Sequence, residues 1–308
     1  MWLTDRRGDL AASSFRQYRS ASLSVLEAIR EGEDLKAGAL EDVQRAIALL
    51  RSTRGLPSTR RREIPPRTSA LKQKRICAWD WEILTSALSA SQRRHAGAIL
   101  MLLNAGLATG LRSSEWINAA ILHDLDDGWQ LKVQNGKSTN GRSHGPTRTF
   151  SWSGCSDEVL AVIDWLGHLE NRLPSDPKQR RRHWNNYYDQ LRDSLNEVWR
   201  ELWPRRKRLP SFYSTRHTFA AAAKAVLTAA EVGALLGHGT DFTAWQHYAR
   251  PPKGGTGLPE FRLPTPNPAE MSQVRKVLGE RLSRATPLQA RLIDLPDSIS
   301  YDQRRLGP

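Results

Sequence analysis

The sequence predicts a mainly α-helical fold with a small antiparallel β-sheet or hairpin. Apolar residues recur at helical spacing over most of the chain. Only two segments, 129–135 and 147–152, alternate between apolar and polar residues as strands do. The length of 308 residues is enough for two domains, or for one large domain with appendages. We therefore expect a helical protein whose sheet is confined to its middle.

The chain is strongly basic, with 46 lysines and arginines against 32 acidic residues and a net charge of +14. Such a balance favours a polyanionic partner, most commonly nucleic acid. The longest apolar run, at 96–103, is far below the roughly 20 residues that span a bilayer, and the first residues lack the apolar region of a signal peptide. Cys77 and Cys155 suggest neither a disulfide framework nor a metal site. We expect a soluble, cytoplasmic protein that associates with nucleic acid and has no membrane segment.

The first part of the chain predicts a small helical domain, followed by a basic linker. Apolar residues at helical spacing predict helices at 14–30 and 40–50, which we assign to a domain of residues 1–55. Residues 56–75 combine prolines with many basic side chains, as in an extended linker that follows DNA phosphates. A solvated surface loop is the alternative. The predicted DNA contacts in this stretch are Arg60, Arg61, Arg62, Arg67, Lys72 and Lys74.

Residues 76–252 predict a larger domain. Helices are expected at 80–90 and 93–106, followed by a tight turn and a new helix that Ser113 or Ser114 would cap. The two alternating segments form a hairpin, whose long mobile loop carries the basic residues Lys137, Arg142 and Arg148. Of these, Arg142 and Arg148 are predicted DNA contacts. Helices resume at 156–171 and at 187–202, separated by a charged break at 175–184.

The stretch from residue 213 to residue 248 contains the candidate chemical groups. Tyr213 and Arg216 are three residues apart in an Ala-rich helix, so they lie on one face. A capping box at 228–231 starts a short helix, and Gly237 is a stop just past its end. His238 therefore leaves a helix C-terminus, which favours its charged form. Tyr248 follows on a polar turn.

Beyond this stretch, residues 253–308 form a Pro-rich C-terminal segment with a helix and a tail. Prolines and glycines exclude one regular element directly after residue 250. An amphipathic helix is expected near 269–282, followed by a polar, arginine-containing tail.

Five motifs in order resemble the tyrosine recombinase (phage integrase) family. They are TGLRSSEW around Arg112, a hairpin lysine at Lys137, YxxRH with Arg216, LLGH with His238, and HY ending at Tyr248. Each alone is weak, but five in this order across the chain are specific. The resemblance implies a catalytic domain of that family preceded by a short helical domain.

The chemistry of these residue types fits metal-free DNA strand exchange. A tyrosine such as Tyr248 can store the phosphodiester energy as a 3′-phosphotyrosyl ester. Arg112 and Arg216 can clamp the charge of the transition state with bidentate hydrogen bonds. Lys137 can protonate the leaving 5′ oxygen as a general acid. By resemblance, His238 hydrogen-bonds the scissile phosphate and helps to position or deprotonate the nucleophile.

The chain departs from the family pattern at Tyr213, where a histidine or another polar residue usually stands. A tyrosine titrates near 10, so Tyr213 is a poor base and is expected to donate a hydrogen bond to the phosphate. The identity of the general base stays open. Glu115 resembles an acidic family residue that orients its neighbours, and His217 is assigned no chemistry.

The resemblance also implies partners. The expected partner is double-stranded DNA, bound by a homo- or hetero-tetramer on paired sites with no metal or other cofactor. The segment after Tyr248 is a candidate arm that docks on a neighbouring protomer. Two alternatives stay open. One is a type IB topoisomerase-like enzyme that relaxes DNA, and the other is a non-catalytic DNA-binding accessory protein that retains the fold.

Overall fold

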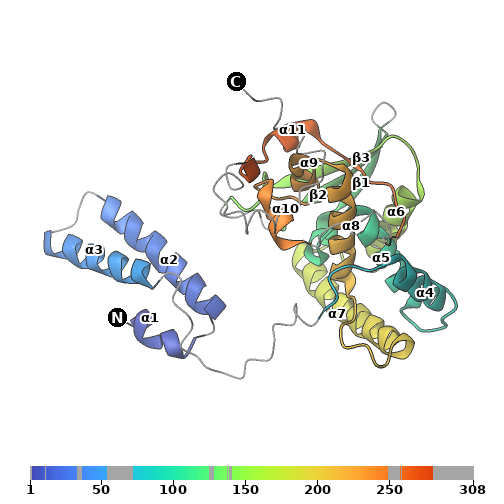
Figure 1. The fold of residues 1–308 in the computed structure, drawn as a ribbon, viewed down its shortest axis with the longest axis horizontal. Helices are drawn as coiled ribbons and strands as arrows, with labels where there is room; N and C mark the ends of the chain where they lie inside the picture. The colour runs from blue at the N-terminus through green and yellow to red at the C-terminus, as the bar shows by residue number, and fades with distance from the viewer. Residues whose placement is uncertain are drawn as a thin grey trace. The chain divides into compact units, whose positions relative to one another are not determined.

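The computed structural model describes residues 2–10, 12–32, 37–53, 72–124, 128–136, 138, 141–248, 257 and 259–279 of the chain. The chain divides into two units, Met1–Thr68 and Ser69–Pro308 (Figure 1). The division falls inside the stretch 56–75 that the sequence marks as a linker. The second unit also includes the C-terminal segment that follows residue 252.

The first unit is a small helical assembly. It contains α1 (Trp2–Asp5), a 3₁₀ turn η1 (Arg6–Gly8), α2 (Ala12–Glu31) and α3 (Ala37–Ser52). The helices predicted at 14–30 and 40–50 are therefore confirmed, while α1 was not predicted. Helices α2 and α3 pack against each other, and a small buried cluster of Leu3, Phe15 and Leu50 holds the unit together.

The second unit is built on two buried helices, α5 (Ala96–Thr109) and α8 (Phe212–Val226), which pack against each other (Figure 1). Helix α5 also contacts α4, α6 and α7, so it is buried on most sides, as its apolar sequence predicts. The other helices among the described residues of this unit are α4 (Ala78–Ser89), η2 (Ser113–Asn118), α6 (Asp157–Glu170), α7 (Pro177–Leu202), α9 (Ala229–Leu235), α10 (Phe242–His247) and α11 (Pro268–Ser272).

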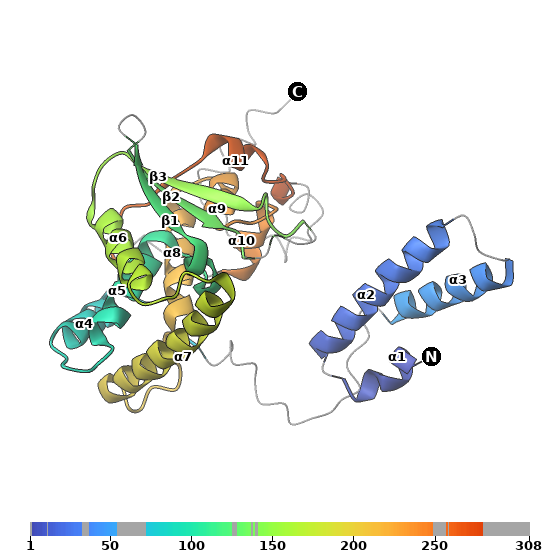
Figure 2. The ribbon, with the colours of Figure 1, turned by 180° about the vertical axis from the view of Figure 1, so that it is seen from behind.

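Among the described residues of this unit, the strands form one antiparallel sheet of four, part of which is labelled in Figure 2. Its strands lie in the order β1 (Ala120–Asp124), β2 (Gly128–Gln134), β3 (Thr147–Trp152) and β4 (Thr265–Pro266). The predicted hairpin is confirmed as β2 and β3, with Leu131 opposite Phe150 and Val133 opposite Arg148. The sequence did not predict β1 and β4, which add a strand on each side.

The predicted charged break at 175–184 is wrong, because α7 begins at Pro177. The side chain of Asp176 accepts a hydrogen bond from the backbone N–H of Gln179, and Pro177 occupies the first helical position. These are the residue types that start helices, so the basic run that follows is helical and not a loop. Trp184, inside the supposed break, is buried in the core.

The predicted helix at 269–282 is also wrong, because α11 ends at Ser272. The backbone N–H of Arg275 donates instead to the carbonyl of Gly239. The carboxylate of Asp241 accepts hydrogen bonds from the N–H groups of Val277 and Leu278. Residues 273–279 thus pack on their own chain, which counts against a free arm over that range. Residues 280–308 of the predicted arm lie outside the described residues.

In the described part of the chain, no helix is long and apolar enough to cross a membrane. Nor do the described residues contain a group of three or more histidine, cysteine, aspartate or glutamate side chains that could hold a metal ion. Cys77 and Cys155 are free thiols.

Candidate active site

The hydroxyl of Tyr248 lies at the centre of a cluster of cations and aromatic rings. Tyr248 directly follows α10 and is 8% exposed. Its hydroxyl accepts a hydrogen bond of 2.7 Å from Nε of Arg216 and lies 3.2 Å from the hydroxyl of Tyr213. The rings of His217 and His238 lie 5.1 and 5.4 Å from the Tyr248 ring, centroid to centroid. The structure thus brings together the four candidate groups that the sequence places between residues 213 and 248, with His217 beside them.

Arg216 is fully buried on α8, and each nitrogen of its guanidinium has a fixed acceptor. Besides the bond from Nε to Tyr248, Nη1 donates to the carbonyl of Gly110 at 2.5 Å and Nη2 to the carbonyl of Leu236 at 2.7 Å. Gly110 and Leu236 are the C-caps of α5 and α9. The carbonyl end of a helix carries a partial negative charge, which favours a cation there. Four helices therefore fix this arginine.

Glu115 joins three guanidinium groups. Its Oε1 accepts from Nη1 of Arg112 at 2.6 Å and from the N–H of Gly136 at 3.2 Å, and its Oε2 accepts from Nη2 of Arg148 at 2.7 Å. The same Oε2 lies 3.8 Å from Nη1 of Arg216. Burial alone would raise the pKa of Glu115, but the three arginines hold that pKa well below its usual range. The carboxylate is thus a fixed anion between three cations.

Arg112 is the least buried of the three arginines, with 13% of its side chain exposed. It is itself the N-cap of η2, and its backbone N–H donates to the Glu115 carboxylate at 2.8 Å. The prediction that Ser113 or Ser114 caps this element is therefore wrong, because Glu115 reaches back to occupy the capping role. Arg112 is held on one side by Glu115 and retains a partly exposed guanidinium.

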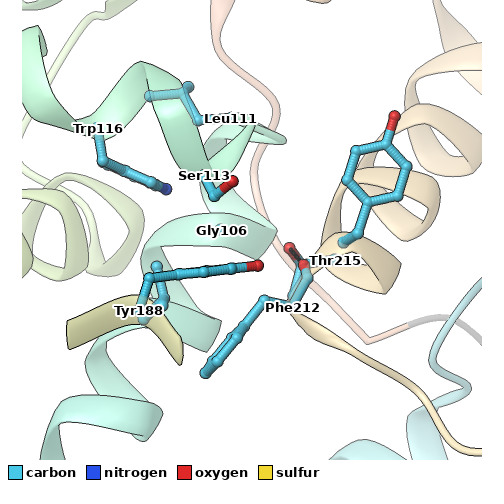
Figure 3. A pocket seen from close by; sticks show the side chains of 9 residues that line it. Gly106, Leu111, Ser113, Trp116, Tyr188, Phe212 and Thr215 are labelled. Atoms are coloured by element: carbon cyan, nitrogen blue, oxygen red, sulfur yellow. Dashed lines mark hydrogen bonds between the residues drawn. The ribbon is translucent and has the colours of Figure 1, made fainter. Parts of the chain in front are cut away.

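A small cavity lies beneath the first turn of α8, as Figure 3 shows. Its volume is about 10 Å³, which is near the smallest space that holds one water molecule. Residues of α5, η2, α7 and α8 line it, among them Ser113, Tyr188 and Thr215. Tyr213 lines the cavity as well, so the packing under this side chain is not tight.

His238 follows Gly237, which ends α9 with a left-handed φ of 65°, as predicted. The prediction that this helix end favours the charged imidazole is wrong. His238 is buried, and its burial, together with the guanidinium groups of Arg216 and Arg112, holds its pKa well below the usual value. Its Nδ1 has no hydrogen-bond partner among the described residues. A neutral imidazole therefore stacks on the ring of Tyr248.

The pKa values of the two tyrosines move in opposite directions. Burial works to raise the pKa of Tyr248, but the charges of Arg216 and Arg112 outweigh it and lower that pKa to about 8. Burial and the neighbouring Tyr248 raise the pKa of Tyr213 to about 12. When one of the pair loses its proton, it is Tyr248.

Arg148 is not in the hairpin loop, so its predicted role as a surface DNA contact is wrong. It lies in β3, is 1% exposed, and donates to the side chains of Asn135 and Glu115. Of the other predicted DNA contacts, Lys72, Lys74 and Arg142 are exposed. The remaining predicted residues lie outside the described part of the chain: Lys137, Arg60, Arg61, Arg62 and Arg67.

Lys224 on α8 also lies at the site, although no motif in the sequence predicts it. This lysine is fully buried, its Nζ donates to the backbone carbonyl of Tyr248 at 3.2 Å, and it lies 5.3 Å from the centroid of the Trp245 ring. A cation over an indole face is stabilised by the ring's charge distribution. Lys224 is eight residues after Arg216, which is the spacing of one helix face. That spacing, in a run of alanines, is the feature that could have identified it.

His217, which was assigned no chemistry, also lies at the site. Its ring contacts the rings of both Tyr213 and Tyr248. Burial, followed by the charge of Lys74, lowers its pKa to about 4. Like His238, it is therefore a neutral ring against the phenol of Tyr248.

No protein-family model matches this sequence, and comparison with the curated proteins gives no match. Solved structures that it resembles include the Tn1549 transposon integrase in complex with a circular intermediate DNA, at 14% identity and a TM-score of 0.36, over 77% of this chain and 82% of that chain. They also include the same integrase in complex with transposon right end DNA, at 15% identity and a TM-score of 0.37, over the same shares. At these values the function has to be inferred from the geometry of the site itself.

Proposed function

We propose that this chain is a site-specific DNA strand-transfer enzyme in which Tyr248 is the nucleophile. The observation that carries the proposal is the 2.7 Å hydrogen bond from Nε of the buried Arg216 to the Tyr248 hydroxyl. Arginine side chains suit the non-bridging oxygens of a phosphodiester, and a phenolate suits in-line attack on its phosphorus. A phenol placed against a buried guanidinium is therefore equipped for phosphotyrosyl chemistry.

The reaction starts when the Tyr248 oxygen attacks the phosphorus of one DNA strand. The P–O5′ bond breaks, so the DNA 3′ end becomes joined to the protein and the other end leaves as a 5′ hydroxyl. Lys137 is the general acid that protonates the leaving oxygen. Its neighbour Gly136 is tied by its N–H to Glu115, which connects this part of the hairpin to the arginine cluster. Attack by another 5′ hydroxyl reverses the step and completes the exchange.

Arg112 and Arg216 differ in how accessible they are before DNA binds. Arg112 is partly exposed and can receive the phosphate first. Arg216 is fully enclosed, and its Nε is occupied by Tyr248. The Nη1 and Nη2 atoms of Arg216 each carry a second N–H, and these are the groups that would donate to the phosphate while Nε stays on the Tyr248 oxygen. His238 and Tyr213 line the same phenol and complete the contact surface for the phosphate.

The remaining parts of the proposal concern DNA binding and assembly. Double-stranded DNA is the partner that the charge of +14 favours. The exposed Lys72, Lys74 and Arg142 are candidate phosphate contacts, as are the basic residues of the linker. Residues 1–55 would contribute a second DNA-binding surface, and exchange between two sites would need four protomers.

A covalent trap tests the nucleophile. The protein is incubated with a pool of nicked duplexes that carry randomised sequence around the nick, so the cleaved fragment diffuses away and the adduct persists. We expect a protein–DNA adduct that resists denaturation, and sequencing the trapped DNA gives the preferred site. Tyr248→Phe should abolish the adduct, whereas Tyr187→Phe, which removes a hydroxyl that bonds to His168 of α6 away from the site, should leave it unchanged.

The outcomes of the trap separate the alternatives. An adduct that persists in Tyr248→Phe would refute the nucleophile assignment. DNA binding without an adduct from the wild type would favour a non-catalytic accessory protein. An adduct accompanied by relaxation of supercoiled plasmid, without any sequence preference, would favour a topoisomerase.

A further inference from the structure

The nucleophile Tyr248 shares its hydroxyl with a second phenol. The Tyr213 hydroxyl lies 3.2 Å from the Tyr248 hydroxyl, and the Arg216 Nε donates to the same oxygen at 2.7 Å. Tyr213 is 43% exposed while Tyr248 is only 8% exposed. The outer phenol therefore stands between the nucleophilic oxygen and solvent.

We propose that Tyr213 donates its hydrogen bond to the ionised oxygen of Tyr248, so that two fixed donors activate the nucleophile and no side-chain base is needed. A donor stabilises a phenolate because it hydrogen-bonds to the charged form. This inference rests on the proposed function for its chemical meaning, but the contact between the two phenols can be tested without DNA.

The surroundings of Tyr248 leave little room for a base. Helix α8 contributes Arg216, Tyr213 and His217 around the ring, and Lys224 at the backbone carbonyl. The turn before η2 contributes the charge of Arg112, with Glu115 paired behind it, and the turn after α9 contributes His238. Among the described residues, the hydrogen-bond partners of the Tyr248 hydroxyl are the guanidinium of Arg216, which donates to it, and the hydroxyl of Tyr213.

The proton affinities agree with this geometry. With the pKa of Tyr248 at about 8 and that of Tyr213 at about 12, Tyr213 keeps its proton over the range in which Tyr248 loses its own. Burial holds the pKa of both His217 and His238 below the usual value, so neither ring supplies a positive charge at neutral pH.

Atoms and charges balance in this step. The proton of Tyr248 passes to water before attack, which leaves a phenolate held by Arg216 and Tyr213. The phenolate oxygen forms the bond to phosphorus as the P–O5′ bond breaks, and the leaving oxygen takes a proton from the general acid. Tyr213 keeps its proton throughout.

The direct test titrates the phenols of the free protein. The chain has six tyrosines, so NMR of tyrosine labelled with ¹³C at Cζ resolves them, and Tyr248→Phe assigns the signal of interest. We expect Tyr213→Phe to raise the pKa of Tyr248 by about one unit, since hydrogen bonds to charged groups are worth about one pKa unit or more. The control Tyr18→Phe should leave that pKa unchanged. An unchanged or lower Tyr248 pKa in Tyr213→Phe would overturn the proposal.

A second variant is expected to move the pKa of Tyr248 in the opposite direction. Replacing Tyr213 with 3-fluorotyrosine keeps the shape of the side chain and makes its hydroxyl a stronger donor. The proposal expects the pKa of Tyr248 to fall. A rise would show that the Tyr213 hydroxyl is not the donor to that oxygen.

The pH profile of adduct formation links this contact to the reaction. Below the pKa of Tyr248 the rate follows the phenolate fraction, so Tyr213→Phe should be slower by up to about tenfold if the Tyr248 pKa rises by about one. The two rates should converge above both pKa values. A loss that is equal at every pH would mean a structural role and would overturn the proposal. If the wild type forms no adduct at all, the proposed function fails, while the NMR titration still decides whether Tyr213 is the donor.

Discussion

The two units of this chain differ in what their interiors can hold. The first unit encloses a few apolar side chains, with Leu3, Phe15 and Leu50 at the centre, and leaves Tyr18 and Val25 of α2 exposed. The second unit encloses a large apolar core and buries several charged side chains within it. Charged groups cost free energy when buried, and only a well-packed interior can hold them in place. The unit with the larger core is therefore the one that can shape a chemical site.

The largest loss of stability is expected at Glu115, in the unit that buries charged side chains. Glu115→Gln removes the negative charge that three buried or partly buried arginines share. Leaving such charges unpaired costs about 3–5 kcal/mol, measurable as a lower denaturation midpoint by tryptophan fluorescence. The matched control is Glu197→Gln, whose partner Arg93 is exposed. A loss at Glu115 no larger than at Glu197 would show that the cluster is not held by this carboxylate.

The depressed pKa of Glu115 also predicts how the stability of the protein changes in acid. The folded-state pKa of Glu115 is depressed, so its contribution to stability is present above the usual glutamate range and disappears as the pH falls through and below that range. The stability difference between wild type and Glu115→Gln should accordingly shrink on acidification. A difference that stays constant from neutral pH to about pH 3 would contradict this.

A smaller effect is expected in the first unit. Leu50→Ala removes one of the few residues of its buried cluster, and such truncations cost about 2–5 kcal/mol, toward the low end where the site can collapse. Hydrogen exchange by mass spectrometry should show faster exchange in peptides from 12–32 and 37–52. Leu49→Ala, an exposed neighbour on the same helix, is the control. Equal protection in both variants would mean that the cluster does not stabilise the unit.

The buried charge of Lys224, in the second unit, is expected to affect the rate of adduct formation more than the stability of the fold. Lys224→Met keeps the side-chain volume but loses the hydrogen bond to the Tyr248 carbonyl. Buried charges are often replaced by apolar groups without loss of stability, whereas a misplaced nucleophile should lower adduct formation about tenfold, which is about 1.4 kcal/mol. The exposed Lys207→Met is the control. A lower unfolding temperature with an unchanged rate of adduct formation would mean that Lys224 stabilises the fold and does not position the nucleophile.

The smallest effect is expected at the exposed side of α2. Val25→Ser replaces an exposed apolar side chain, and surface changes of this kind stay within about 0.5 kcal/mol. The measurement is again hydrogen exchange of residues 12–32. A large loss of protection would mean that Val25 is covered in solution.

Much of the fold follows from local sequence features, whereas the site depends on long-range packing. The Thr228–Glu231 capping box and Gly237 end a helix where predicted, because capping involves neighbours in the chain. Asp176 and Pro177 are helix-start signals for α7 in the same way, but the basic run after them favours a loop. Strands β1 and β4 could not be predicted in this way, because β4 pairs with a strand more than a hundred residues away.

The inward orientation of Arg148 follows from the alternation of side chains along its strand. Phe150 and Trp152 face the core, and Arg148 has the same parity, so it points inward as well. Its charge suggested a surface loop, but the period of the strand was the better guide. What the sequence could not give is the partner, because Glu115 is more than thirty residues away and reaches Arg148 only in the folded unit.

The way Arg216 is held ties the acidity of Tyr248 to the completion of the fold. Its guanidinium is oriented by the carbonyl ends of α5 and α9 and meets a phenol at the end of α10. None of these acceptors is close to it in sequence, so the arginine reaches its place only when all these helices have packed. In a partly folded chain, Tyr248 would have the ordinary acidity of a phenol. Under the function proposed above, such a chain would carry a poor nucleophile, and only a chain with a complete core would cleave DNA.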